Sequence, residues 1–160
     1  MNIIDFALKM EADGKAWYER LAAESSKKDV KDIFALLADA EQRHYNTILG
    51  LRSGTYALAE SDVLVQAKNI FKDLLEMTEL DAEFQFDRDG YRHAIAAEEE
   101  SIKLYEGAAR DENNEDVRAL LLRIAGEERE HLEIVTNMYQ YMEAPRTFLE
   151  WVEFSNRTRL

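Results

Sequence analysis

Apolar residues recur every three to four positions in four long stretches of the chain, which is the pattern of helices that bury one face. These stretches cover approximately residues 2–24, 29–51, 87–111 and 116–143. Short polar breaks separate the first stretch from the second and the third from the fourth. The pattern therefore predicts two antiparallel helical hairpins that pack together as a four-helix bundle.

A longer connection, residues 52–86, joins the two hairpins. Within it, an amphipathic stretch over 63–78 predicts a crossover helix with Ser61 as its N-cap. A helix of about 20 residues is about 30 Å long, so a connection of this length can return the chain to the other end of the bundle. Residues 81–86 contain two phenylalanines and are expected to form an irregular lead-in to the next helix.

Pro145 favours the start of a new helix, so residues 145–160 are expected to form a short C-terminal helix. Several large apolar side chains in this extension are expected to pack on the bundle or on a second copy of the chain, which predicts a homodimer. They are Phe148, Leu149, Trp151, Val152 and Phe154.

Composition supports a single all-α domain spanning residues 1–160. The sequence has 46% hydrophobic residues, one proline and six glycines, which favours long helices over a fold with many turns. There is no cysteine, so disulfides, cysteine-based metal sites and a cysteine nucleophile are excluded.

The charge and the hydropathy pattern exclude further classes. A net charge of −13 argues against a surface for nucleic acid or for anionic membranes. No apolar run approaches the ~20 residues that a transmembrane helix needs. The first residues lack the basic region and cleavage site of a secretory signal, so a cytoplasmic protein is expected.

The candidate chemistry lies in two Glu-x-x-His motifs, Glu41 to His44 and Glu128 to His131. Residues three apart lie one turn apart on the same face of a helix, so each motif can present a carboxylate and an imidazole to one metal ion. The two motifs are 87 positions apart in the sequence. Their spacing indicates an internal repeat, residues 5–50 and 92–137.

The same offset of 87 relates Glu11 to Glu98 and Tyr18 to Tyr105, so both halves read Glu-x6-Tyr followed by Glu-x-x-His. Any one of these glutamates, taken alone, is more often a solvated surface residue. However, the four glutamates and two histidines all fall on the apolar stripes. Buried unpaired carboxylates cost several kcal/mol each. Two divalent ions would balance the four negative charges, which predicts a dimetal site.

Neighbouring residues leave alternatives to this assignment. Glu99 and Glu100 compete with Glu98, but the repeat and the pairing with Tyr105 favour Glu98. His93 lies roughly 140° around the helix from Glu98 and is not expected to be a ligand. Each tyrosine lies almost two turns after its glutamate. It is interpreted either as a hydrogen-bond donor to a metal-bound carboxylate of the opposite half or as ordinary core packing.

One Glu from each of two helices and a Glu-x-x-His from each of the other two resembles the ferritin-like di-iron carboxylate proteins. The closeness of Glu-x6-Tyr to Glu-x-x-His in both halves is similar to the rubrerythrin branch, over about residues 3–143. The resemblance implies a ferritin-like four-helix bundle with a long crossover between its second and third helices. It also implies two iron ions. Glu41 and Glu128 would bridge them, and Glu11 and Glu98 would be terminal ligands. His44 and His131 would each bind one iron.

The sequence departs from that family in two ways. Full-length rubrerythrin carries a four-cysteine rubredoxin-like domain, which is absent here, so electrons would come from a separate donor protein. Rubrerythrin also tends to have an extra carboxylate one turn after the third-helix ligand, where this chain has Ser101. This serine puts the ligand-switching step of peroxide reduction in doubt.

The resemblance implies a non-haem di-iron oxidoreductase of the oxidative-stress type. We expect a rubrerythrin-like peroxidase that reduces hydrogen peroxide or dioxygen. Manganese or a mixed metal pair also suits carboxylate and imidazole ligands. The alternatives are a ferroxidase or iron-binding or storage protein without a turnover cycle, and a helical interaction module with an empty site.

Overall fold

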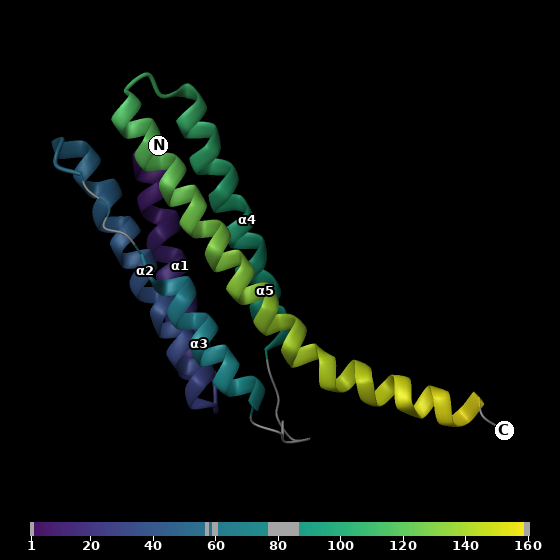
Figure 1. Cartoon of the computed structure of the whole chain (residues 1–160). Helices are drawn as coiled ribbons and strands as arrows, with labels where there is room; N and C mark the ends of the chain where they lie inside the picture. Colours follow the sequence, from purple (N-terminus) through teal and green to yellow (C-terminus); the bar gives the residue numbers. More distant parts are fainter. Residues whose placement is uncertain (1, 57, 59–60, 77–86, 159–160) are drawn as a thin grey trace.

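The computed structural model of the chain consists of five α-helices, with no strand among the residues it describes (Figure 1). The helices are α1 Ile3–Glu24, α2 Lys28–Ser53, α3 Val63–Glu76, α4 Arg88–Asp111 and α5 Glu115–Thr158. The structure describes residues 2–56, 58, 61–76 and 87–158, of which 75–76 and 144–158 by their backbone alone. The predicted all-α, ferritin-like bundle is confirmed.

Helices α1 and α2 pack along each other as one hairpin, and α4 and α5 as the other (Figure 1). Side-chain caps begin three of these helices, α1, α4 and α5. The Asn2 side chain accepts a hydrogen bond from the Asp5 N–H at 2.9 Å at the start of α1. The Asp87 carboxylate accepts one from the Gly90 N–H at 2.8 Å at the start of α4. Such caps satisfy backbone donors that have no partner within the helix.

Aspartates also occur in the first turns of α2 and α5, but neither of them caps its helix. Asp29 and Asp116 are each the second residue of their helices, α2 and α5, not the N-cap. Asn114 caps α5, because its side chain accepts from the Asp116 N–H at 2.9 Å, and Lys27 precedes α2 without a side-chain cap. An acidic residue in the first turn interacts favourably with the helix dipole without capping, which explains the similar sequence signal.

The predicted crossover helix is present as α3, which lies beside α2 and α5 (Figure 1). The Ser61 hydroxyl accepts a hydrogen bond from the Val63 N–H at 3.3 Å, as expected of a cap. Val63, Ala67 and Leu74 are buried against the bundle. The expected irregular segment 81–86 lies outside the described residues.

The C-terminal helix expected from Pro145 is instead the end of α5, which continues to Thr158 over 44 residues. Proline removes one backbone hydrogen bond and kinks a helix, but it need not end it. The last third of α5 changes direction and runs away from the bundle (Figure 1). The side chains of 145–160 lie outside the described ones, so their packing stays a prediction.

The bundle core consists of two apolar clusters. One surrounds Phe34 and includes Leu21, Leu37 and Val135, and the other surrounds Ile124 and includes Leu8. Buried polar residues occupy the intervening positions on all four bundle helices. Among the described residues, no helix combines the length and hydropathy needed to span a bilayer.

Candidate metal centre

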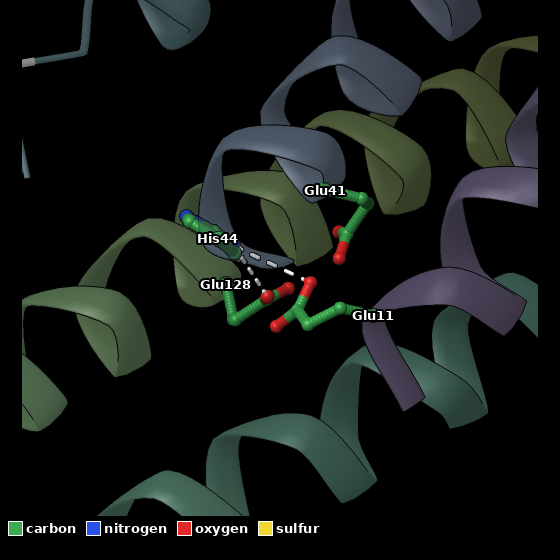
Figure 2. A group of neighbouring side chains, drawn as sticks. All are labelled: Glu11, Glu41, His44 and Glu128. Atoms are coloured by element: carbon green, nitrogen blue, oxygen red, sulfur yellow. Dashed lines mark hydrogen bonds and ion pairs between the residues drawn. The ribbon is translucent and has the colours of Figure 1, made fainter. Parts of the chain in front are cut away.

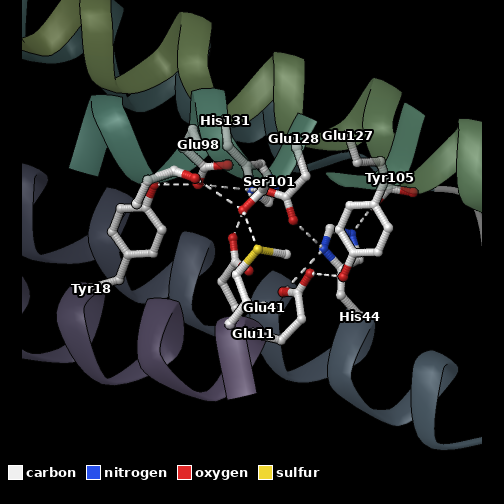
Figure 3. A network of polar contacts seen from close by, with 12 residues as sticks. Glu11, Tyr18, Glu41, His44, Glu98, Ser101, Tyr105, Glu127, Glu128 and His131 are labelled. Atoms are coloured by element: carbon white, nitrogen blue, oxygen red, sulfur yellow. Dashed lines mark hydrogen bonds and ion pairs between the residues drawn. The ribbon is translucent and has the colours of Figure 1, made fainter. Parts of the chain in front are cut away.

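The six predicted site residues come together in the interior of the bundle (Figure 3). Each bundle helix contributes, and no residue of the set is more than 3% exposed. They are Glu11 from α1, Glu41 and His44 from α2, Glu98 from α4, and Glu128 and His131 from α5. The periodic stripes that predicted the helices therefore also deliver these side chains to one layer.

Their donor atoms form two groups of four. One group is Glu11, Glu41, His44 and Glu128 (Figure 2), and the other is Glu41, Glu98, Glu128 and His131. Within each group, one ligand atom per residue lies within 4.8 Å of all the others. Glu41 and Glu128 belong to both groups. Each group could hold a metal ion, and the two groups have two carboxylates in common.

The two groups have nearly the same internal distances. His44 Nδ1 lies 2.9 Å from Glu128 Oε1 and 3.6 Å from Glu11 Oε2. His131 Nδ1 lies 3.1 Å from Glu41 Oε1 and 3.6 Å from Glu98 Oε1. The two imidazole rings are stacked at a centroid distance of 5.6 Å. The internal repeat of the sequence is therefore present in the geometry of the site.

Two tyrosines extend the network to the opposite half of the chain. The Tyr18 hydroxyl donates to Glu98 Oε1 at 2.5 Å, and the Tyr105 hydroxyl donates to Glu11 Oε1 at 2.5 Å (Figure 3). Burial, followed by the negative charge of nearby glutamates, raises the pKa of both phenols well above the usual range. Both hydroxyls therefore remain proton donors at neutral pH.

Burial raises the pKa of two site carboxylates, Glu98 and Glu41. It raises the pKa of Glu98 to about 8 and, with the charge of Glu11, raises the pKa of Glu41 well above its ordinary value. Burial also raises the pKa of Glu128, but hydrogen bonds with Glu98, His131 and His44 outweigh it, and this pKa lies well below the ordinary value. Of these three carboxylates, Glu128 therefore stays charged most readily.

The imidazoles respond to the same charges. Burial lowers the pKa of His44 and His131, but hydrogen bonds to the surrounding glutamates outweigh burial and raise both values well above the ordinary range. In the metal-free chain, protons on the imidazoles thus neutralise part of the carboxylate charge. A metal ion bound at the same atoms would replace those protons.

Buried carboxylate oxygens that lack a hydrogen bond indicate whether metal ions would fit in the two groups. Within the described part of the chain, Oε2 of Glu11, Glu98 and Glu128 is buried without a hydrogen-bond partner. Buried polar atoms are otherwise almost always paired, and leaving one unpaired is costly. Cations placed in the two groups would satisfy these oxygens. The donor set of carboxylates and imidazoles also suits iron or manganese.

The structure shows which of three consecutive glutamates on α4 faces the interior of the bundle. Glu98 is buried, whereas Glu99 and Glu100 are exposed. His93 is also exposed, and its ring lies 4.1 Å from that of Trp17, outside the two groups. Both expectations about these residues agree with the structure. The roles of the six residues as metal ligands, and of the tyrosines in the reaction, remain predictions.

Sequence reasoning missed Glu127. Its Oε1 lies 3.0 Å from His44 Nε2, on the side of the ring that faces away from the other carboxylates. The residue is 8% exposed. It follows Ile124 by three positions and therefore also falls on the buried stripe of α5. That spacing is the signal that would have found it.

Ser101 is buried where the related family tends to have an additional carboxylate. Its hydroxyl lies 3.0 Å from the Ala97 carbonyl oxygen and 3.3 Å from Met10 Sδ. These contacts are local to α4 and to the adjacent side chain on α1. A serine in this position is too short to replace a carboxylate in either group.

The fold and the site together define a ferritin-like helical bundle with a buried carboxylate and histidine cluster able to bind metal. Residues 89–155 match the Rubrerythrin family model. This match and the all-helical fold are consistent with a rubrerythrin-like, ferritin-like domain, and the family suggests iron. No curated protein and no solved structure matches the chain significantly.

Proposed function

We propose that this protein is a non-haem di-iron oxidoreductase that reduces hydrogen peroxide, or dioxygen, with electrons from a separate donor protein. The observation that carries the proposal is the sharing of Glu41 and Glu128 between two groups of four donor atoms. Two ferrous ions supply two electrons, which with two protons convert one hydrogen peroxide into two water molecules.

The residues of the chain have distinct roles in this proposal. Glu41 and Glu128 would contribute to holding both ions, and Glu11 and Glu98 would each hold one of them. His44 and His131 present Nδ1 to one ion each, which matches the side of each ring that faces the carboxylates. The six side chains are buried, and a hollow of about 330 Å³ that is lined in part by Glu11 and Glu41 gives small molecules a route toward them.

The tyrosines hold protons at defined atoms. Tyr18 and Tyr105 each donate to one oxygen of a terminal carboxylate, so the hydroxyls restrict how Glu98 and Glu11 can rotate. In this way they position the terminal ligands for the ions. Their raised pKa values keep the phenols protonated in this role.

Ser101 favours a second candidate, a ferroxidase or iron-binding protein without a turnover cycle. A carboxylate at this position would offer an additional ligand when the ions change oxidation state. The buried serine here contacts only Ala97 and Met10 in its described hydrogen bonds. The same six residues would bind iron in both candidates, so kinetics must separate them.

An anaerobic titration with Fe²⁺ followed by stopped-flow oxidation tests the proposal. We expect two equivalents of Fe²⁺ per chain and a diferrous protein that reacts with hydrogen peroxide faster than with dioxygen. Repeated cycles with a chemical reductant should consume peroxide catalytically. Oxidation by peroxide no faster than that of free Fe²⁺ would reject the peroxidase. Rapid reaction with dioxygen and no turnover would instead support the ferroxidase.

A further inference from the structure

The internal repeat is broken at one contact of the site. His44 Nε2 has the Glu127 carboxylate at 3.0 Å, but the residue 87 positions before Glu127 is Ala40, whose methyl group offers no acceptor. His131 Nε2 is buried and has no hydrogen-bond partner in the described part of the chain. The two imidazoles, nearly equivalent at Nδ1, therefore differ at Nε2 (Figure 3).

This difference matters because a neutral imidazole has one N–H and one lone pair. A metal ion at Nδ1 requires the lone pair there, which places the proton on Nε2. An ionised carboxylate is only an acceptor, so Glu127 stabilises the tautomer of His44 that binds metal through Nδ1. Such partners orient histidine ligands and increase their basicity. His131 lacks this support.

We propose that Glu127 is a positioning residue that makes the two metal positions unequal. It holds the His44 ring with Nε2–H toward itself and Nδ1 toward Glu11 and Glu128, so that the ion at the His44 position binds more tightly than the ion at the His131 position. This inference rests on metal binding at the proposed centre but not on the identity of the oxidant.

Glu127 lies at the edge of the bundle, so it can be replaced without leaving a closed cavity in the core. Besides contacting His44, it lines a surface hollow of about 380 Å³ together with Ser61, Arg123, Gly126 and Glu130. A shorter side chain at position 127 would extend this hollow instead of leaving a closed cavity in the core. Glu130 lines the same hollow, but no hydrogen bond connects it to His44 within the described residues, so it serves as a matched control.

Anaerobic titration of the metal-free full chain with Co²⁺, followed by absorption, measures the two positions separately. We expect two binding steps in the wild type. Glu127→Ala should weaken the tighter step by about 10–100-fold, the usual effect of losing such a partner, and leave the weaker step unchanged. Glu130→Ala removes a nearby charge and should leave both steps at wild-type affinity.

Nitrogen-15 NMR of the Zn²⁺-loaded protein reports the contact directly. The His44 Nε2–H proton should exchange slowly with solvent in the wild type and in Glu127→Gln, because the amide oxygen can still accept. It should exchange faster in Glu127→Ala, while the His131 signal stays unchanged. A conservative variant that restores the signal separates positioning from a general effect on packing.

Two results would overturn the inference and leave the dimetal centre intact. One is unchanged Co²⁺ affinities in Glu127→Ala. The other, which needs no variant, is a His44 Nε2–H proton that exchanges as fast as that of His131 in the wild type. Absence of stoichiometric Co²⁺ binding in the wild type would overturn this inference and the proposed function together.

Discussion

The hydroxyl of Tyr18 on α1 donates a hydrogen bond of 2.5 Å to Glu98 Oε1 on α4. The equivalent bond runs in the opposite direction from Tyr105 on α4 to Glu11 on α1, also at 2.5 Å. Each hairpin therefore supplies the donor that positions a carboxylate of the other hairpin. These two bonds connect α1 to α4 in the middle of the bundle.

Replacing Tyr18 with phenylalanine removes one of these bonds and leaves the ring in place. We expect Tyr18→Phe to reduce the free energy of unfolding of the metal-loaded protein by about 1–3 kcal/mol, the usual effect of losing a hydrogen bond to a charged group. Urea titration measures this change. Tyr45→Phe on α2 is the control, because the hydroxyl of Tyr45 makes no described hydrogen bond to the site, and equal losses in both variants would contradict the prediction.

Glutamates that belong to both groups should affect both metal ions. Glu128→Gln removes a charge from each group, so we expect less than one Fe²⁺ per chain in anaerobic equilibrium dialysis. Glu11→Gln affects one group only and should retain about one Fe²⁺ per chain. Equal stoichiometry for the two variants would show that Glu128 is not shared between two ions.

The metal-free protein should lose stability as pH rises from about 4.5 to about 8. The pKa of Glu98 is about 8 in the folded chain and has an ordinary value of 4.5, so between these values the folded state holds a proton that the unfolded chain has released. The free energy of unfolding then falls as pH increases. The raised pKa values of Glu41, His44 and His131 act in the same direction.

Below this range the sign reverses, because the pKa of Glu128 lies well below its ordinary value and its contribution is lost as pH falls through it. Urea titrations of the metal-free chain at pH 5, 6.5 and 8 test the prediction. A loss on the order of a few kcal/mol is expected across this range. Two bound divalent ions should remove most of this dependence, since they replace the protons. A free energy of unfolding of the metal-free chain that stays constant from pH 5 to pH 8 would refute the raised pKa values of the buried site residues.

Two helical glycines should respond oppositely to alanine. At Gly50 a Cβ atom would collide with the backbone carbonyl oxygen of Thr55, which follows the left-handed Gly54 (φ 74°) at the end of α2. We expect Gly50→Ala to lower the free energy of unfolding by about 1–3 kcal/mol. At Gly126 a Cβ atom would meet nothing within 4 Å, so Gly126→Ala should be neutral or stabilise by up to about 1 kcal/mol. Thermal unfolding of both variants measures the difference, and stabilisation of both would argue against the tight turn.

Much of this fold is predictable because apolar residues recur with the period of the α-helix in every bundle helix. The apolar period placed all four bundle helices. The repeat and the pairing with Tyr105 selected Glu98, which is buried, over its exposed neighbours Glu99 and Glu100. The repeat then related Glu41 to Glu128 without any structural information. Polar residues on an otherwise apolar stripe are the strongest sequence signal in this chain.

Other features depend on relations that no local pattern contains. The contact of Glu127 with His44 joins side chains of α5 and α2, so its existence depends on how the two helices pack. The cap of α5 is Asn114 and not Asp116, two positions later, although both residue types suit a helix start. The continuation of α5 past Pro145 depends on whether a proline bends a helix or ends it.

The division of the two groups between the halves of the chain has a consequence for assembly. In one group, the first hairpin supplies Glu11, Glu41 and His44, and the second hairpin supplies Glu128. In the other group, the second hairpin supplies Glu98, Glu128 and His131, and the first supplies Glu41. Neither hairpin can complete a binding site alone. Binding of an ion at either group would therefore require the two hairpins to have docked in register.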